Sequence, residues 1–111
     1  MDKSIIEKIK QMDTASISDA MDKLGIPCGL HGIQAVVSGN KICGEAFTVH
    51  YIPCGAEKGT VGDFIDEVEP GQVVVIDNVG RTYCTVWGDI MTFTAKTKGI
   101  EGTLIDVCVV M

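Results

Sequence analysis

The last third of the chain carries the pattern that most restricts its fold. A proline-glycine turn precedes the continuous apolar run QVVVID, residues 72–77, and a glycine-bearing loop, residues 78–88, follows it. A helix is predicted over residues 89–98, closed by Gly99, and a final apolar strand over residues 102–110. Since a run that is apolar at every position is typical of a strand buried on both faces, the sequence predicts a terminal β-loop-α-β unit.

This unit also predicts where a ligand would bind. A helix that crosses over between two strands of one sheet leaves the two strands parallel, and such crossovers are nearly always right-handed. Their carboxyl ends then lie at one edge of the sheet, here called the rim, and ligands of open α/β sheets bind there. The loop after Asp77, up to Gly88 and Asp89, and the residues after Val109 should meet at this rim.

The N-terminal part of the chain predicts two amphipathic helices. Ser4 is expected to cap the first, over residues 4–12. In the second, over residues 14–25, Ser16 and Asp19 form an S-x-x-D capping arrangement, and the glycine at its end supplies a left-handed stop.

Strands are expected next, at residues 33–37 and 41–52, because both stretches are rich in β-branched residues or alternate in polarity. A short helix is predicted over residues 60–68, ahead of the buried strand. With 111 residues and no linker or repeat, residues 1–111 are expected to form a single α/β domain.

Composition narrows the possible functions. The apolar runs are too short to span a membrane, and no signal peptide is recognisable, so a cytoplasmic location is expected. A net charge of −6 with a single arginine argues against nucleic acid as a partner. The five cysteines include no metal-binding spacing and are expected to be reduced thiols.

The predicted start of the last helix is the best candidate for an anion site. Backbone amides of Gly88, Asp89, Ile90 and Met91 could hold a carboxylate, helped by the helix dipole. The alternative is that Asp89 simply caps the helix, and the spacing alone favours this second interpretation.

Several segments resemble the RraA-like family over essentially the whole chain. They are TASISDAMDKLG, GEAFTV, PGQVVVIDNVG and above all VWGDIMTFTAKTKGIEGTLID. The family includes the class II aldolase for 4-hydroxy-4-methyl-2-oxoglutarate and the regulator of ribonuclease activity A. The resemblance implies a layered, swivelling β/β/α domain, a trimer or hexamer, and a pyruvyl ligand held by the amides of residues 88–91.

The sequence departs from this family at its most informative place. The family pattern is an Asp, twenty intervening residues and an Arg-Asp pair, and counting from Asp89 puts Val110 and Met111 where that pair should stand. In the family the Arg stabilises the enolate, the Asp anchors Mg²⁺ or Mn²⁺, and the residue matching Asp89 orders a water for proton transfer. Neither a valine nor a methionine supplies the lost charges. Metal binding and aldolase or oxaloacetate decarboxylase activity are therefore expected to be impaired.

Three interpretations of the function remain. The chain is a weakened metal-dependent pyruvate aldolase, a non-enzymatic regulator that binds a protein such as a ribonuclease, or a frameshifted remnant that lacks the family's C-terminal part. Self-association is expected in each case, because an apolar strand that ends abruptly leaves a surface to cover.

Other candidates are weaker. Arg81 could meet an anion at the rim, although a lone loop arginine is more often solvated or paired with an acid. His31 and His50 lack ligand-like spacing, and a structural role is expected for His50. Asp106, inside an apolar strand, needs a hydrogen-bond partner and is expected to position the loop rather than bind metal.

Overall fold

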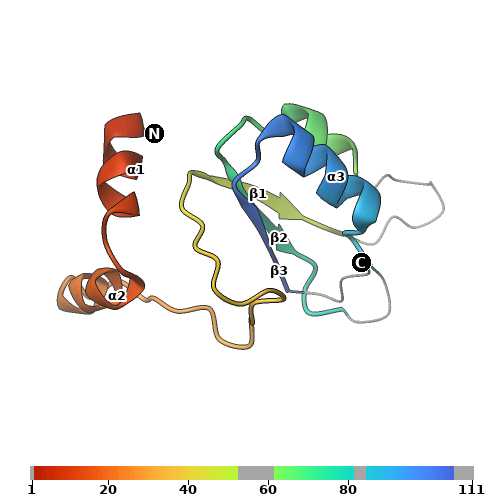
Figure 1. The fold of residues 1–111 in the computed structure, drawn as a ribbon. Helices are drawn as coiled ribbons and strands as arrows, with labels where there is room; N and C mark the ends of the chain where they lie inside the picture. Colours follow the sequence, from red (N-terminus) through yellow and green to blue (C-terminus); the bar gives the residue numbers. More distant parts are fainter. Residues whose placement is uncertain (1, 53–61, 82–84, 107–111) are drawn as a thin grey trace. The chain divides into compact units, whose positions relative to one another are not determined.

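A computed structural model of the chain describes residues 2–52, 62–81 and 85–106 (Figure 1). The chain divides into two compact units, residues 1–43 and residues 44–111. None of the described helices is long and apolar enough to cross a membrane.

The second unit contains a parallel sheet of three strands. They are β1 (Ala46–His50), β2 (Val73–Asp77) and β3 (Gly102–Ile105), in the order β1-β2-β3. Register pairs Ala46 with Val73, and Val73 in turn with Gly102. Residues 73–77 of the predicted run therefore form the central strand, and the parallel β-loop-α-β unit is confirmed.

One face of the sheet carries the core, beneath the helix α3 (Asp89–Lys98) and the 3₁₀ helix η1 (Asp63–Glu67) (Figure 1). Alternation along β2 directs Val74 and Ile76 to this face, and both are buried. They join a cluster with the buried side chains of η1, α3 and the segment before α3, namely Ile65, Val68, Val86, Trp87 and Ala95. Lys98 Nζ ties the two helices together by donating to the carbonyls of Ile65 and Asp66, at 2.8 and 3.1 Å.

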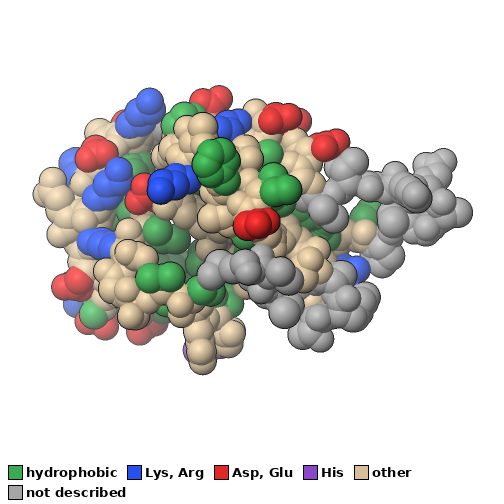
Figure 2. Space-filling view, turned by 45° about the vertical axis from the view of Figure 1, so that its right-hand side comes forward, with side chains coloured by type: hydrophobic (Ala, Val, Ile, Leu, Met, Phe, Trp, Pro, Cys, Tyr) green, Lys and Arg blue, Asp and Glu red, His purple; other side chains and the backbone are tan. Residues whose placement is uncertain are grey.

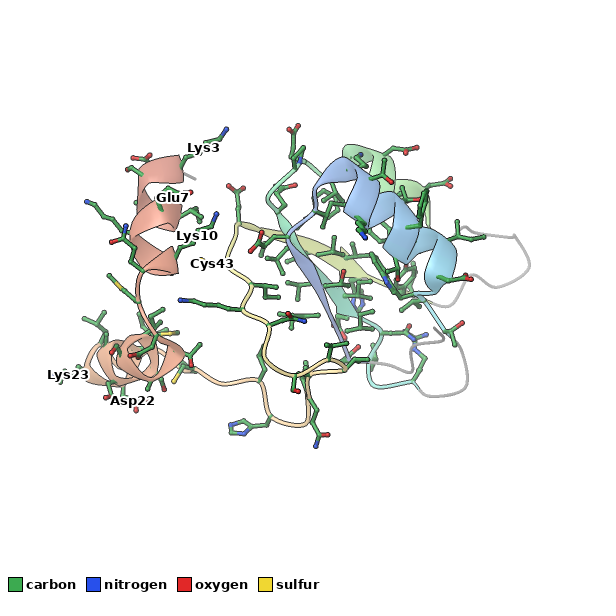
Figure 3. All side chains as sticks on the ribbon, viewed as in Figure 1. Lys3, Glu7, Lys10, Asp22, Lys23 and Cys43 are labelled. Atoms are coloured by element: carbon green, nitrogen blue, oxygen red, sulfur yellow. The ribbon has the colours of Figure 1, made fainter. Side chains whose placement is uncertain are left out.

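The first unit contains α1 (Lys3–Lys10) and α2 (Thr14–Lys23). Lys41 Nζ donates to the carbonyls of Lys10 and Met12 at 2.8 and 2.7 Å, so the following segment folds back on the end of α1. Figure 3 shows the charged side chains of α1, among which Lys10 and Glu7 form an ion pair at 3.4 Å. No residue from 2 to 43 is buried, so this unit lacks a core of its own.

Four expectations about residues 2–52 were wrong in detail. The N-caps are Asp2 and Asp13, whose carboxylates accept from the amides of Ser4 and Ser16; both serines lie inside the helices. An aspartate two or three residues earlier, on extended backbone, accepts from these amides instead. Residues 33–37 form no strand, because they pair with no neighbour among the described residues, and the strand expected over 41–52 is shorter, at Ala46–His50.

The helix boundaries of the second unit follow the sequence closely. Gly99 ends α3 with φ at 75°, as predicted, and the short helix expected over 60–68 is η1. The expected last strand is observed as Gly102–Ile105; Asp106, also predicted to be in it, is a bend just after it, and residues 107–110 lie outside the described residues.

Gly44 provides a test of how closely the segment before β1 packs against the turn before β2. A Cβ at this position would overlap the carbonyl oxygen of Gly71, a backbone atom that cannot rotate away. We expect Gly44→Ala to lower the free energy of unfolding by roughly 1–3 kcal/mol, measured by urea denaturation. Gly62→Ala is the matched control, because its Cβ would stand 3.7 Å from the flexible Met91 sulfur. Equal stability of the two variants would contradict the close packing.

Candidate functional site

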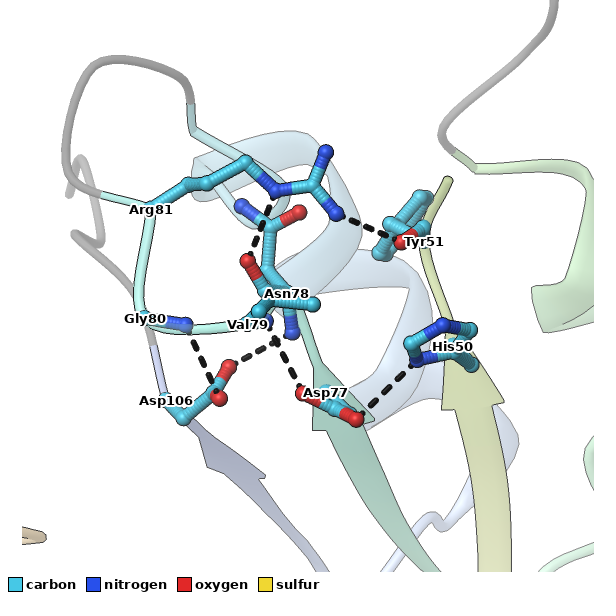
Figure 4. Close-up of polar contacts among 8 residues, drawn as sticks. All are labelled: His50, Tyr51, Asp77, Asn78, Val79, Gly80, Arg81 and Asp106. Carbon is cyan, nitrogen blue, oxygen red and sulfur yellow. Dashed lines mark hydrogen bonds and ion pairs between the residues drawn. The ribbon is translucent and has the colours of Figure 1, made fainter. Parts of the chain in front are cut away.

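The rim brings together residues from three strand ends (Figure 4). His50 and Asp77 are register partners at the ends of β1 and β2, and Asp106 follows β3 directly. Parallel pairing places all three at one edge, so the strand ends meet at the rim as the sequence predicted; that a ligand binds there stays a prediction. The loop after β2 and the start of α3 lie at this edge too, because α3 leads the chain back to the opposite end of β3.

The loop after β2 begins with a tight turn in an unusual conformation. The Arg81 amide donates to the Asn78 carbonyl at 3.1 Å, and the two central residues, Val79 and Gly80, have φ values of 56° and 67°. Positive φ at both central positions is typical of a type I′ turn. Glycine accepts it freely, but for a β-branched valine the left-handed region costs about 1–2 kcal/mol.

Two carboxylates hold this turn. Asp106 accepts from the Asn78 amide through Oδ1 at 2.6 Å and from the Gly80 amide through Oδ2 at 3.1 Å. Asp77 Oδ1 accepts from the amide between them, that of Val79, at 2.9 Å. The prediction that Asp106 positions the loop is therefore confirmed, and charge-assisted bonds of this kind offset the strain at Val79.

His50 and Arg81 also take part in this network. His50 Nδ1 lies 3.0 Å from Asp77 Oδ2, which gives this histidine a structural contact, as expected. The hydrogen bond from the Val79 amide is the main cause of a lowered pKa of the Asp77 carboxyl. The contact with His50 lowers this pKa further. Arg81 donates from Nε to the Asn78 carbonyl and from Nη2 to the Tyr51 carbonyl, at 3.0 and 2.8 Å. The expectation that Arg81 would be solvated or paired with an acid was wrong, since backbone carbonyls of two elements take its protons.

The start of α3 is held by a threonine. Gly88 is the N-cap and has no side-chain capping bond, so the interpretation of Asp89 as the N-cap was wrong. Asp89 is the first helical residue, and its Oδ1 accepts from the Ile90 amide at 2.9 Å. Thr92 Oγ1 donates to the Gly88 carbonyl and accepts from Trp87 Nε1, both at 2.8 Å. Nothing in the sequence pattern singled out this threonine.

The predicted ligand amides, residues 88–91, thus form a helix start with one acid beside it. The first amides of any helix have no intrahelical acceptor, and here the Asp89 carboxylate covers one of them. An anion binding to the others would meet a local dipole that favours it and a carboxylate that opposes it. Ile90 is 79% exposed, so the helix start is open to solvent on that side.

The described residues alone do not fit a divalent metal. Within residues 2–52, 62–81 and 85–106, no three His, Cys, Asp or Glu side chains are grouped to hold an ion. At the rim, Asp77 and Asp106 already accept from the loop amides. Val110 and Met111, which stand where the resemblance expects Arg-Asp, lie outside the described residues, and His31 belongs to the first unit.

The Thr92 contact can be tested by removing its hydroxyl. In Thr92→Val, the indole N–H of the buried Trp87 loses its acceptor and the Gly88 carbonyl loses a donor, so the free energy of unfolding should fall by about 1 kcal/mol. Trp87 is the only tryptophan, and its fluorescence during urea unfolding reports the change. Thr97→Val is the matched control, because that hydroxyl donates only to the Phe93 carbonyl. A loss as large in the control would refute a special role for Thr92.

Comparisons with known proteins agree with this architecture. The family model described as RraA-like, Aldolase/RraA, matches residues 14–109. Protein DlpA of Legionella pneumophila is 41% identical over 92% of this chain and 17% of its own length. A putative 4-hydroxy-4-methyl-2-oxoglutarate aldolase of Halalkalibacterium halodurans is 31% identical over 91% of this chain and 46% of its own.

Among solved structures, Streptomyces coelicolor RraAS2 superimposes with a TM-score of 0.85 at 28% identity. It is described as an unusual member of the RNase ES inhibitor RraA protein family, and the match covers 96% of this chain and 55% of that one. The chain thus spans less than half the length of the two curated relatives and about half of this solved structure. The family model covers most of the sequence, and this chain belongs to the RraA-like family.

Proposed function

We propose that the rim binds a small 2-oxo acid, with the acid's carboxylate on the backbone amides at the start of α3, residues 88–91. The observation that carries this proposal is the placement of a solvent-open helix start at the carboxyl edge of a parallel sheet. The relative named as a putative 4-hydroxy-4-methyl-2-oxoglutarate aldolase supports a 2-oxo acid as the ligand class.

The reaction proposed for the family fold is cleavage of a carbon–carbon bond that leaves a pyruvate enolate, by retro-aldol cleavage or by decarboxylation of oxaloacetate. A bound Mg²⁺ or Mn²⁺ would stabilise the enolate charge. In this chain the amides of residues 88–91 would hold the substrate carboxylate, and Asp89 would order the water that carries a proton.

We further propose that this chain alone is a weak or inactive aldolase. Val110 and Met111 carry no charge, and the guanidinium of Arg81 is engaged with two backbone carbonyls. Losing a single charge-stabilising donor costs roughly 10²–10³ in rate, and two losses need not add.

Binding and turnover are best measured separately. For binding, ¹⁵N-labelled chain is titrated with oxalate or pyruvate, with chloride at equal ionic strength as the control. We expect the largest shifts at the amides of Asp89, Ile90 and Met91, because these begin the helix. Shifts confined to other amides would overturn the proposed ligand position.

For turnover, pyruvate release from oxaloacetate is followed with Mg²⁺ or Mn²⁺. We expect little release from the unaltered chain and an increase in the double variant Val110→Arg, Met111→Asp, which restores both charges. The double variant Val110→Gln, Met111→Asn adds polarity without charge and serves as the control. Robust metal-dependent turnover by the unaltered chain would refute the impairment.

A second function is favoured by the outer surface of α3. Ile90 and Phe93 lie one turn apart and are 79% and 72% exposed. Figure 2 shows hydrophobic side chains exposed between acidic and basic ones on the face that it draws. Neighbouring exposed apolar side chains can form a protein interface, and the Streptomyces structure belongs to a family named for ribonuclease inhibition. A regulator that binds a ribonuclease, or self-association of the chain, would use this surface.

The two functions predict different effects of Phe93→Ser. If α3 binds a protein, the variant should lose inhibition of an RNase E-type ribonuclease or shift the chain toward monomer in light scattering. Oxalate binding at residues 88–91 should remain, since the phenyl ring is not part of the amide site. No change in inhibition or in molecular mass would leave only the small-molecule function.

A further inference from the structure

Three consecutive backbone amides at the rim all point at carboxylate oxygens. The amides of Asn78, Val79 and Gly80 donate to Asp106, Asp77 and Asp106 respectively, over 2.6 to 3.1 Å. Successive N–H groups in a turn of this kind form a concave anion-binding nest. In the phosphate sites built this way the anion is a separate ligand, whereas here it belongs to the chain.

The two aspartates have different roles in this nest. Asp77 bonds the amide two residues ahead, a local contact that a turn can form without the rest of the fold. Asp106 instead comes from the far end of β3, 28 residues from Asn78, and binds the first and third amides with its two oxygens. Its own amide donates to the Ile76 carbonyl at 3.3 Å, which extends the pairing of β2 with β3 and fixes the carboxylate in place.

The conformation of this turn determines where the Arg81 side chain lies. The Asn78 carbonyl accepts from both the backbone amide and Nε of Arg81, so the guanidinium is bound to the first peptide group of the turn. From there Nη2 reaches the Tyr51 carbonyl just beyond β1 (Figure 4). A turn that relaxed from positive φ at Val79 would move that carbonyl and release the guanidinium.

We propose that the Asp106 carboxylate is the resident anion of the nest formed by the amides of residues 78–80, and that it acts as a positioning residue for Arg81. The first and third amides of the nest bind the two oxygens of one carboxylate. A small free carboxylate such as formate should therefore occupy the nest when the Asp106 side chain is cut back.

The experiment is a chemical rescue. In Asp106→Ala, amide hydrogen exchange at Asn78 and Gly80, and exchange of the Arg81 Nε–H, should accelerate at least tenfold, while the amides of β2 stay protected. Formate at about 0.1 M should restore most of this protection, and chloride at equal ionic strength should not. Asp66→Ala is the matched control, since it removes the same charge from an exposed side chain of η1 and should respond to neither salt.

Two outcomes would overturn the proposal. One is unchanged exchange at the three protons in Asp106→Ala. The other is faster exchange that formate fails to slow, because the amides would then not form a carboxylate site. If amide exchange became faster but exchange of the Arg81 Nε–H did not change, Asp106 would still be the anion of the nest but would not position Arg81.

A second variant keeps the test decisive if Asp106→Ala does not fold. Asp106→Asn retains one acceptor oxygen, so exactly one of the two amides, Asn78 or Gly80, should keep its protection. Equal protection of both would contradict the two-oxygen contact. Each measurement reports on the turn and not on turnover, so its result is independent of whether the rim binds a 2-oxo acid.

Discussion

Parallel pairing of β2 with a strand on each side is the interaction on which the rest of the second unit depends. Val74 and Ile76 of β2 belong to the buried core of this unit. The pairing on either side of β2 aligns the ends of β1 and β3 with Asp77. Because all three strands run parallel, each ends at the same edge of the sheet. The rim network and the start of α3 are both consequences of this arrangement.

The rim shows how a chain can stabilise a turn that its own sequence disfavours. Valine is a poor residue for the left-handed region, yet Val79 occupies it with its side chain 63% exposed. The turn keeps this conformation because neighbouring side chains hydrogen-bond its peptide groups. Asp106 and Asp77 accept from the amides, and Arg81 donates to a carbonyl. Strain offset in this way is common at functional sites, so the turn supports the hypothesis that the rim has a function.

The sequence predicted the elements that follow from simple periodicity. The continuous apolar run of β2 and the glycine that ends α3 carry their signals within a few residues, and both were placed correctly. Residues 33–37 have strand-like composition, but a strand also needs a partner, which is not a local property. The helix caps were misplaced because serine and aspartate compete for the same amides, and only geometry decides which reaches them.

The candidate site was predicted unevenly for a similar reason. Its edge of the sheet follows from topology, and the role of Asp106 follows from the need to satisfy a carboxylate within an apolar strand. The anchoring of Arg81 could not be predicted, because it depends on a contact that appears only when the strands are aligned. The contacts of Thr92 are local, but Thr94 and Thr97 also bond the carbonyl four residues earlier, so the sequence does not single Thr92 out. Positive φ at Val79 contradicts the propensity of valine, so no local pattern indicates it.

The contact between Asp106 and Asn78 also has a consequence for the order in which the molecule assembles. It joins positions 28 residues apart, and the entropy of closing so long a loop is offset only after β2 and β3 have paired. We therefore expect the rim to be completed only after this pairing. If the contact forms after the folding barrier, loosening it would mainly speed unfolding and shorten the lifetime of the native state.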